Sequence, residues 1–364
     1  MKVRLCNHIL NAAGCLLSFW ALSSCGDSAF TAKVEKTAEP DKTFELNVEK
    51  IETDHLYSEY FATYDSVLIS SCPNSPEFLF YVSDLKNNEL SGAFMRKGQG
   101  PGEYLGLTPI KRIERRGNDL IALTYEPHKR KLLEWNITQS IETGKDSIVS
   151  LGFYENSNDY DFTYSAMYKI GDSKYLGYTP GFSQRRIKPL LPTYWVLEGQ
   201  NAVPTHGISV VKRMIDNKDS QVAASKFFNS TWCLSPDNTK IADAMSWLKQ
   251  INIIDLATND VKSYRMKDSP GEGIFEGEME YASYQYHNVV CDDNSIYALY
   301  FGEPLSTYKD TLGCYWLHEF DWTGKFKKKY RLPVPLVRLW VDSSNNTLYG
   351  YSTAEDAIYK LKVN

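Results

Sequence analysis

The end of the chain contains the pattern that most limits its possible folds. Residues 336–363 read LVRLWVDSSNNTLYGYSTAEDAIYKLKV. An apolar run, a turn of Asp, Ser and Asn, a second apolar run, a short loop and a third run follow one another. Short runs rich in β-branched and aromatic residues, separated by turn-forming residues, are typical of antiparallel strands joined by tight turns. The segment therefore predicts three consecutive strands.

The same strand–turn–strand unit recurs along the chain. Six copies are found, at residues 66–82, 110–125, 164–179, 228–245, 286–300 and 336–351. Each is followed by a third apolar run, at residues 90–96, 131–135, 194–197, 250–256, 315–322 and 357–363. The spacing of the units is close to the repeat length of propeller blades.

Fourth strands are expected at residues 147–152, 207–213, 260–266 and 325–331, but the last unit has none because the chain ends. An isolated strand is predicted at residues 44–51, where Phe44, Leu46 and Val48 alternate with polar residues. Pairing this strand with the last unit would close a ring of sheets and remove two exposed edges. The sequence therefore predicts an all-β, six-bladed β-propeller, closed by pairing an N-terminal strand with the C-terminal blade. A pair of β-sandwiches would not predict six similar units.

The N-terminus has the features of an export signal. Lys2 and Arg4 precede an apolar stretch at residues 15–22 that is too short to span a bilayer. It ends in Leu-Ser-Ser-Cys-Gly, which resembles a bacterial lipoprotein lipobox with Cys25 as the lipid attachment site. We expect a signal peptide at 1–24, a flexible tether at 25–42 and the propeller at 43–364. The expected location is the cell envelope, on the outer membrane, periplasmic or surface side, with an ordinary secretory signal as the alternative.

Composition narrows the partners. The formal charge of the chain is −5, and removing residues 1–24 takes away Lys2 and Arg4 and leaves −7. An acidic protein lacks the basic surface that phosphate neutralisation needs, so nucleic acid is not an expected partner. Four cysteines lie beyond Cys25, namely Cys72, Cys233, Cys291 and Cys314, without C-x-x-C or zinc spacing. An oxidising compartment would permit disulfides, but we interpret these cysteines first as small buried hydrophobic residues.

A glycine-rich motif follows the third strand of the first unit. Residues 98–104 read GQGPGEY, which can continue neither a strand nor a helix and lacks the pattern of a phosphate-binding loop. Together with the lipobox and the repeated units, this motif resembles the TolB-like six-bladed propeller lipoproteins of Gram-negative anaerobes. The resemblance covers about residues 43–364 and implies the propeller fold and an envelope location. The motif occupies the place expected for the fourth strand of the first unit. We therefore weigh structural closure of that blade against a ligand-binding role for Glu103 and Tyr104.

Long connections are predicted on one face of the propeller, at residues 179–193, 217–226, 267–280 and 301–313. Long loops in compact folds often carry function. The candidate ligand-binding residues are Arg185, Arg186, Glu272, Glu276 and Tyr308, with Glu103 and Tyr104 from the glycine-rich motif. The alternative to a ligand-binding role is that these are two solvated loops of opposite charge.

These features favour a lipid-anchored, non-catalytic binding or scaffold module for a protein, peptide or glycan. No nucleophile or metal-binding motif is present, so no catalytic residue, metal or cofactor is assigned. The alternative is a metal-assisted hydrolase or lactonase with carboxylates at the channel mouth.

Overall fold

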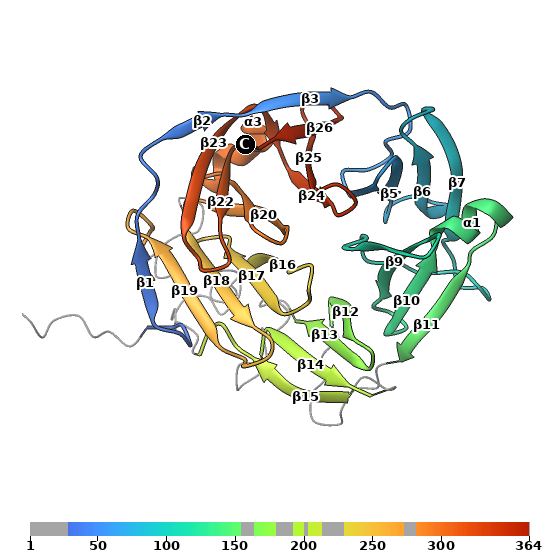
Figure 1. Ribbon diagram of the computed structural model, residues 1–364, viewed down its shortest axis with the longest axis horizontal. Coiled ribbons are helices and arrows are strands. Elements are labelled where there is room, and N and C mark those ends of the chain that lie inside the picture. The colour runs from blue at the N-terminus through green and yellow to red at the C-terminus, as the bar shows by residue number, and fades with distance from the viewer. Residues whose placement is uncertain are drawn as a thin grey trace, which may run out of the picture.

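The protein is a ring of six antiparallel sheets, or blades, around a central channel (Figure 1). The computed structural model describes residues 28–153, 164–179, 192–199, 203–212, 229–272 and 282–363. The first three blades each consist of four strands: β4 (Phe61–Tyr64), β5 (Val67–Ser71), β6 (Phe78–Asp84) and β7 (Glu89–Arg96) in blade 1; β8 (Ile113–Arg116), β9 (Asp119–Glu126), β10 (Lys131–Asn136) and β11 (Ile148–Phe153) in blade 2; and β12 (Ala166–Gly171), β13 (Lys174–Tyr178), β14 (Tyr194–Glu198) and β15 (Val203–Ile208) in blade 3.

The last three blades each receive a strand from the N-terminal part of the chain. Their strands are β16 (Ser230–Leu234), β17 (Lys240–Met245), β18 (Gln250–Asp255), β19 (Val261–Met266) and β1 (Val34–Thr37) in blade 4; β20 (Tyr286–Cys291), β21 (Ile296–Tyr300), β22 (Cys314–Phe320), β23 (Phe326–Leu336) and β2 (Thr43–Glu45) in blade 5; and β24 (Arg338–Asp342), β25 (Thr347–Ser352), β26 (Ala357–Lys362) and β3 (Asn47–Ile51) in blade 6. Three short helices complete the described elements: α1 (Ile137–Thr143), η4 (Leu305–Thr307) and α3 (Tyr308–Thr311). Among the residues that the structure describes, no helix is both long and apolar enough to cross a membrane.

The predicted closure of the ring is confirmed, but the strand predicted at residues 44–51 is two strands, of which β3 pairs with blade 6 and β2 pairs with blade 5. β3 pairs antiparallel with β26, with Ile51 opposite Ile358 and Asn47 opposite Lys362. The chain therefore completes its last blade with residues from its N-terminal part, and β26 becomes an inner strand of the sheet, with β3 as the outer strand.

Tight turns join the strands at the positions where the sequence has Asn or Asp. Asp65, Asn88, Asn238, Asn259 and Asn346 all have φ between 53° and 64°. Asn and Asp tolerate the left-handed region better than other non-glycine residues because their short side chains bond to nearby backbone groups. The turn residues read from the sequence therefore determine where each strand reverses.

The hydrophobic core lies between neighbouring blades. Trp135 is fully buried and its ring lies 5.3 Å from that of Phe80 and 5.6 Å from that of Phe94, across the boundary of blades 1 and 2. Similar clusters fill the boundaries between blades 2 and 3, 3 and 4, 4 and 5, and 5 and 6. Since each blade buries both faces, its middle strands are apolar on both sides.

The prediction for the first blade was wrong by one strand. Residues 66–71 are the second strand of blade 1, because the first, β4, ends one residue before the turn at Asp65. Blade 1 is therefore complete, and the glycine-rich motif follows its fourth strand as part of the connection to blade 2. The fourth strand of blade 3 was also misplaced, since it is β15 and not residues 207–213.

The prediction of a flexible tether at residues 25–42 was wrong for the part that the structure describes. β1 pairs in parallel with β19 and β2 with β23, so the N-terminal segment, residues 28–51, runs along the outer edges of three blades (Figure 1). Phe30 is buried to 1% exposure. Polar composition suggested a tether, but unpaired outer strands offer backbone groups with which such a segment can pair.

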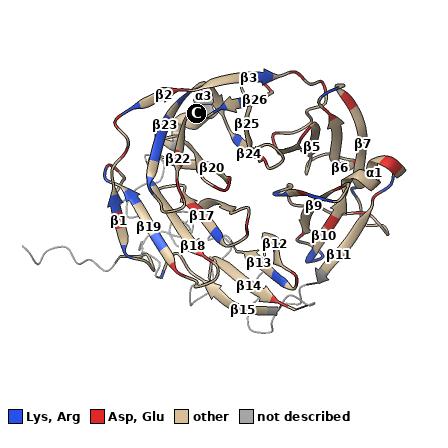
Figure 2. Ribbon diagram, viewed as in Figure 1, with Lys and Arg blue, Asp and Glu red and all other residues tan. Residues whose placement is uncertain are grey.

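Charge holds this segment in place. Figure 2 shows basic residues along β19 and β23 beside the N-terminal segment. Glu39, between β1 and β2, forms ion pairs with Lys249 and Lys329, and Lys249 also contacts Asp268 at 2.9 Å. Lys249 is only 4% exposed, so its charge depends on these carboxylates.

Candidate functional site

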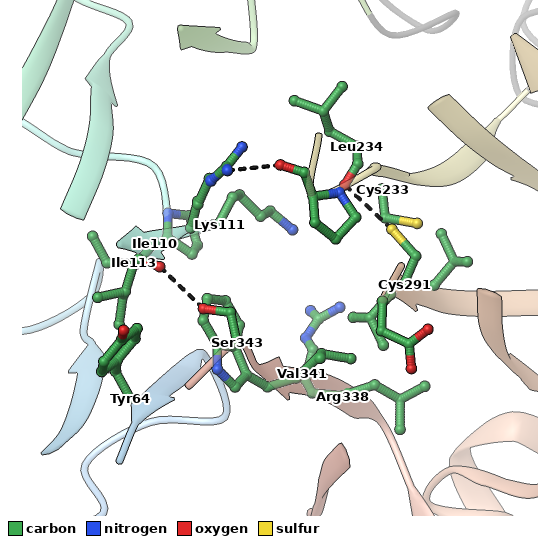
Figure 3. Close-up of a pocket in the computed structure, with 18 of the residues that line it drawn as sticks. Tyr64, Ile110, Lys111, Ile113, Cys233, Leu234, Cys291, Arg338, Val341 and Ser343 are labelled. Carbon is green, nitrogen blue, oxygen red and sulfur yellow. Dashed lines mark hydrogen bonds between the residues drawn. The ribbon is translucent and has the colours of Figure 1, made fainter. Parts of the chain in front are cut away.

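The first strands of the blades surround a cavity of about 360 Å³ in the central channel (Figure 3). This volume lies within the range of small-ligand sites. The wall is mixed in character: aromatic rings from Tyr60, Trp232 and Trp340 line it together with charged side chains. The innermost strands meet at the axis because they are the narrow ends of six wedge-shaped blades, and their side chains are thereby brought together from distant parts of the sequence.

Lys111 projects into this cavity from the segment that precedes β8 (Figure 3). Its amine forms no hydrogen bond or ion pair with any residue that the structure describes. The side chain is exposed to the channel, although the ring of blades surrounds it (Figure 3). The surrounding protein, and then the charge of Arg338, lowers the pKa of Lys111 to about 8. An amine without a counter-ion is thus held in a confined space.

Arg338, the first residue of β24, is the second cation that points into the channel (Figure 3). Its nearest carboxylate is Glu59, at 3.6 Å, and its guanidinium lies 4.5 Å from the centre of the Tyr60 ring. The buried Nε of Arg338 has no hydrogen-bond partner among the described residues. The guanidinium is therefore positioned by packing and one long ion pair, with donor capacity to spare.

A polar aromatic cluster adjoins Arg338. The Tyr308 hydroxyl lies 3.1 Å from Nε2 of His287, and the Tyr308 ring packs edge-on against Tyr284 and Phe301. Burial, and then the charge of Arg338, lowers the pKa of His287 to about 4. His287 is therefore neutral at physiological pH and can exchange a hydrogen bond with Tyr308.

Hydrogen bonds cross the channel near the turns that join the first and second strands. The Arg112 guanidinium reaches the β16–β17 turn, where it donates to the carbonyl of Pro236 at 2.8 Å and to the side chain of Asn238. The Ser343 hydroxyl, from the β24–β25 turn, donates to the carbonyl of Ile113 at 3.3 Å. These contacts join blades 2 and 4 and blades 2 and 6, which are not adjacent in the ring, and so narrow the channel at this face.

Among the predicted residues that the structure describes, Tyr308 is the one brought near the cavity wall, since it contacts His287, which faces Arg338. Glu272 lies elsewhere, with its carboxylate accepting hydrogen bonds from the Ser28 hydroxyl at 3.0 Å, the Ala29 amide at 2.9 Å and Arg265 at 3.2 Å. These contacts fasten the N-terminal segment to blade 4. The hydrogen bonds of Glu272 thus serve the stability of the fold.

Glu103 and Tyr104 close their own loop. The Glu103 carboxylate accepts a hydrogen bond from the Gly100 amide at 2.8 Å, and the Tyr104 amide donates to the carbonyl of Arg96 at 2.9 Å. Lys129 donates to the Glu103 carbonyl at 2.8 Å. A side chain at Gly98 would collide with the Glu103 carboxylate, which explains the glycine there. Glu103 and Tyr104 therefore make contacts that hold the glycine-rich loop in its conformation.

Several predicted residues lie outside the described part of the chain, namely Cys25, Arg185, Arg186 and Glu276. Within the described ranges, no group of three or more His, Cys, Asp or Glu side chains is placed to hold a metal ion. The converging carboxylates that a metal-assisted hydrolase would need are therefore not found in this part of the chain.

Sequence reasoning missed the channel residues Lys111 and Arg338. Lys111 lies two residues before β8, between Ile110 and Arg112, and Arg338 begins β24, between Val337 and Leu339. The sequence could have indicated them through their position, because a cation next to an innermost strand lies beside the channel.

Comparison with known proteins identifies the fold. No family model and no curated protein matches the sequence. A Bacteroides fragilis protein described as exported has 12% identity and a TM-score of 0.52, with 90% of this chain and 99% of that chain covered. A member of the DUF4221 family from Bacteroides vulgatus has 9% identity and a TM-score of 0.57, with 89% and 99% covered. At such identities the similarity shows the fold, a six-bladed propeller. The TolB-like assignment stays a prediction.

Proposed function

We propose that this protein is a lipid-anchored envelope protein that binds, without catalysis, a carboxylate-bearing ligand in its central channel. The observation that carries the proposal is the placement of Lys111 and Arg338. Both cations project into one cavity, and the Lys111 amine has no anionic partner among the described residues. The carboxylate could come from a peptide or from an acidic glycan.

Electrostatics supports an anion at this position. Like charges near each other disfavour one another, and the charge of Arg338 adds to burial in lowering the pKa of Lys111. A bound carboxylate would relieve that repulsion and accept charge-assisted hydrogen bonds, each contributing about 1.5–3 kcal/mol. The rings of Tyr60, Trp232 and Trp340 offer flat apolar surfaces for the rest of the ligand.

The envelope location is supported by the lipobox-like sequence at Cys25, by the resemblance of the 98–104 motif to TolB-like lipoproteins, and by the exported structural neighbour. Ser28, already fastened to Glu272, follows Cys25 by three residues, so a lipid on Cys25 would hold the propeller within about 10 Å of the bilayer. Labelling cells with an alkyne fatty acid tests the anchor. Wild-type protein should carry the label and the Cys25→Ser variant should not; equal labelling would contradict the anchor.

Matched probes test the binding site and separate the two ligand sources. We would titrate a tripeptide with a free C-terminal carboxylate against its C-terminal amide, and an oligoglucuronate against the neutral oligoglucose, following tryptophan fluorescence. Only the charged member of a pair should bind. The Lys111→Met and Arg338→Met variants should each weaken binding about tenfold, the equivalent of one hydrogen bond to a charge. The control Lys262→Met, on the exposed face of β19, should bind as wild type. Equal binding of charged and neutral probes would overturn the proposal.

A further inference from the structure

Two cysteines stand side by side in the channel wall. Cys233 is on β16 and Cys291 ends β20, the first strands of adjacent blades, and both line the cavity (Figure 3). The Cys291 thiol donates to the carbonyl of Leu234, the neighbour of Cys233, at 3.2 Å, which places it beside the Cys233 side chain (Figure 3). Both side chains are partly exposed, whereas Cys72 and Cys314 are buried elsewhere.

This arrangement differs from the one expected of cysteines used as buried hydrophobic residues. That interpretation suits Cys72, whose thiol donates to backbone carbonyls, and Cys314, which is fully buried. It does not explain why two thiols from strands far apart in the sequence face each other at an accessible surface. The contact of the Cys291 thiol with the residue that follows Cys233 brings the two side chains near the separation that a disulfide needs.

We infer that Cys233 and Cys291 form a reversible disulfide when the protein meets a disulfide oxidant. One thiolate attacks a sulfur of the oxidant and releases one thiol, which leaves a mixed disulfide on the protein. The second cysteine thiolate then attacks that protein-bound sulfur and releases the second thiol. In total, two cysteine thiols are oxidised to one disulfide and the oxidant is reduced to two thiols.

The bond would tie blades 4 and 5 together at the channel. The N-terminal segment already joins the same two blades along their outer edges through β1 and β2. The disulfide would add a covalent link on the inner side and close a long loop of the chain, which restricts the unfolded state. Burial, and then the neighbouring Cys233, raises the pKa of the Cys291 thiol, so the exchange should be slow at neutral pH and faster in alkali.

Peptide mapping of the full chain tests this inference. The reduced protein is treated with the small reagent 2-hydroxyethyl disulfide, free thiols are alkylated, and the digest is analysed by mass spectrometry. We expect a cross-linked peptide pair containing Cys233 and Cys291, with Cys72 and Cys314 still alkylated. The thermal midpoint should rise by about 5 °C.

The single variants Cys233→Ser and Cys291→Ser provide the control, since neither can form the link and each should lose the rise in thermal midpoint. The mapping on wild-type protein decides the question even if a variant fails to fold. Recovery of Cys233 and Cys291 as alkylated thiols after prolonged oxidation at alkaline pH, or their pairing with other cysteines, would overturn the inference.

Discussion

The Glu39 carboxylate lies 3.1 Å from the Lys329 amine and so joins the N-terminal segment to the outer strand of blade 5. The same carboxylate pairs with Lys249, which is almost fully buried. One side chain between two short parallel strands thus adds ionic contacts to those that the buried Phe30 and Leu46 make at either end of the segment.

Replacing Glu39 with Gln should therefore destabilise the protein. Two cations would lose an anionic partner in a partly buried site, which costs about 1–3 kcal/mol in the free energy of unfolding. Urea denaturation measures this loss, and limited proteolysis should cut the variant first within residues 28–51. The matched control is Asp41→Asn, an exposed residue of the same segment, which should stay within about 0.5 kcal/mol of wild type. Equal stability of the two variants would contradict this role of Glu39.

Substitutions at Gly98 and Glu103 should have non-additive effects on the free energy of unfolding. A Cβ at Gly98 meets the end of the Glu103 side chain, so Gly98→Ala should displace the carboxylate from Gly100 and cost about 1 kcal/mol. Glu103→Ala alone removes the hydrogen bond to Gly100 and should cost about 1 kcal/mol. In the double variant the collision is gone, so the combined loss should be smaller than the sum. Strict additivity in a double-mutant cycle measured by denaturation would show that the carboxylate does not occupy this position.

Anion binding in the channel should depend on pH in a range where an ordinary lysine does not titrate. Because the pKa of Lys111 lies at about 8, its charge is present below that pH and is lost as the pH rises through it. The affinity for sulfate, whose own charge is constant here, should fall about tenfold between pH 7 and pH 9. Fluorescence titration measures this change, with Trp232 and Trp340 as reporters in the wall. The Lys111→Met variant should bind weakly at both values, and a flat wild-type profile would disprove the assignment.

Stability should fall on mild acidification. His287, which faces Arg338, Tyr284 and Tyr308, has its pKa lowered to about 4, and burial beside Lys249 and Lys329 lowers the pKa of His318 well below its usual value. The unfolded chain binds these protons near pH 6.5 and the folded chain does not, so stability is present above pH 6.5 and declines below it. Each histidine contributes a slope of up to about 1.4 kcal/mol per pH unit in the free energy of unfolding.

Urea denaturation between pH 7 and pH 5 measures this slope. The His287→Gln variant should show a smaller slope, because it lacks the contribution of His287 to the pH dependence of the free energy of unfolding. If the slope of the variant equals that of wild type, His287 is protonated in the folded state.

The strand pattern of the chain was predictable because it is local. Alternating apolar residues define each strand and Asn or Asp at each reversal defines each turn, so six units could be inferred, as could the pairing of a strand predicted at 44–51 with the last blade. Blade 1 was shifted because its first strand, β4, is only four residues long and merges with the polar residues before it. The course of residues 28–42 could not be predicted, since a polar segment has no period of its own and its pairing partners are edges supplied by β19 and β23.

By itself, the sequence determined the fold class, the number of blades and the strand that closes the ring, since periodicity and turn chemistry act over a few neighbouring residues. Only the tertiary structure decided that Lys111 and Arg338 share a cavity and that Cys233 meets Cys291. The physical reason is that each innermost strand brings a few side chains to the axis. Which of them meet depends on the order of the blades and on the height of each strand in the channel, and no local pattern encodes either.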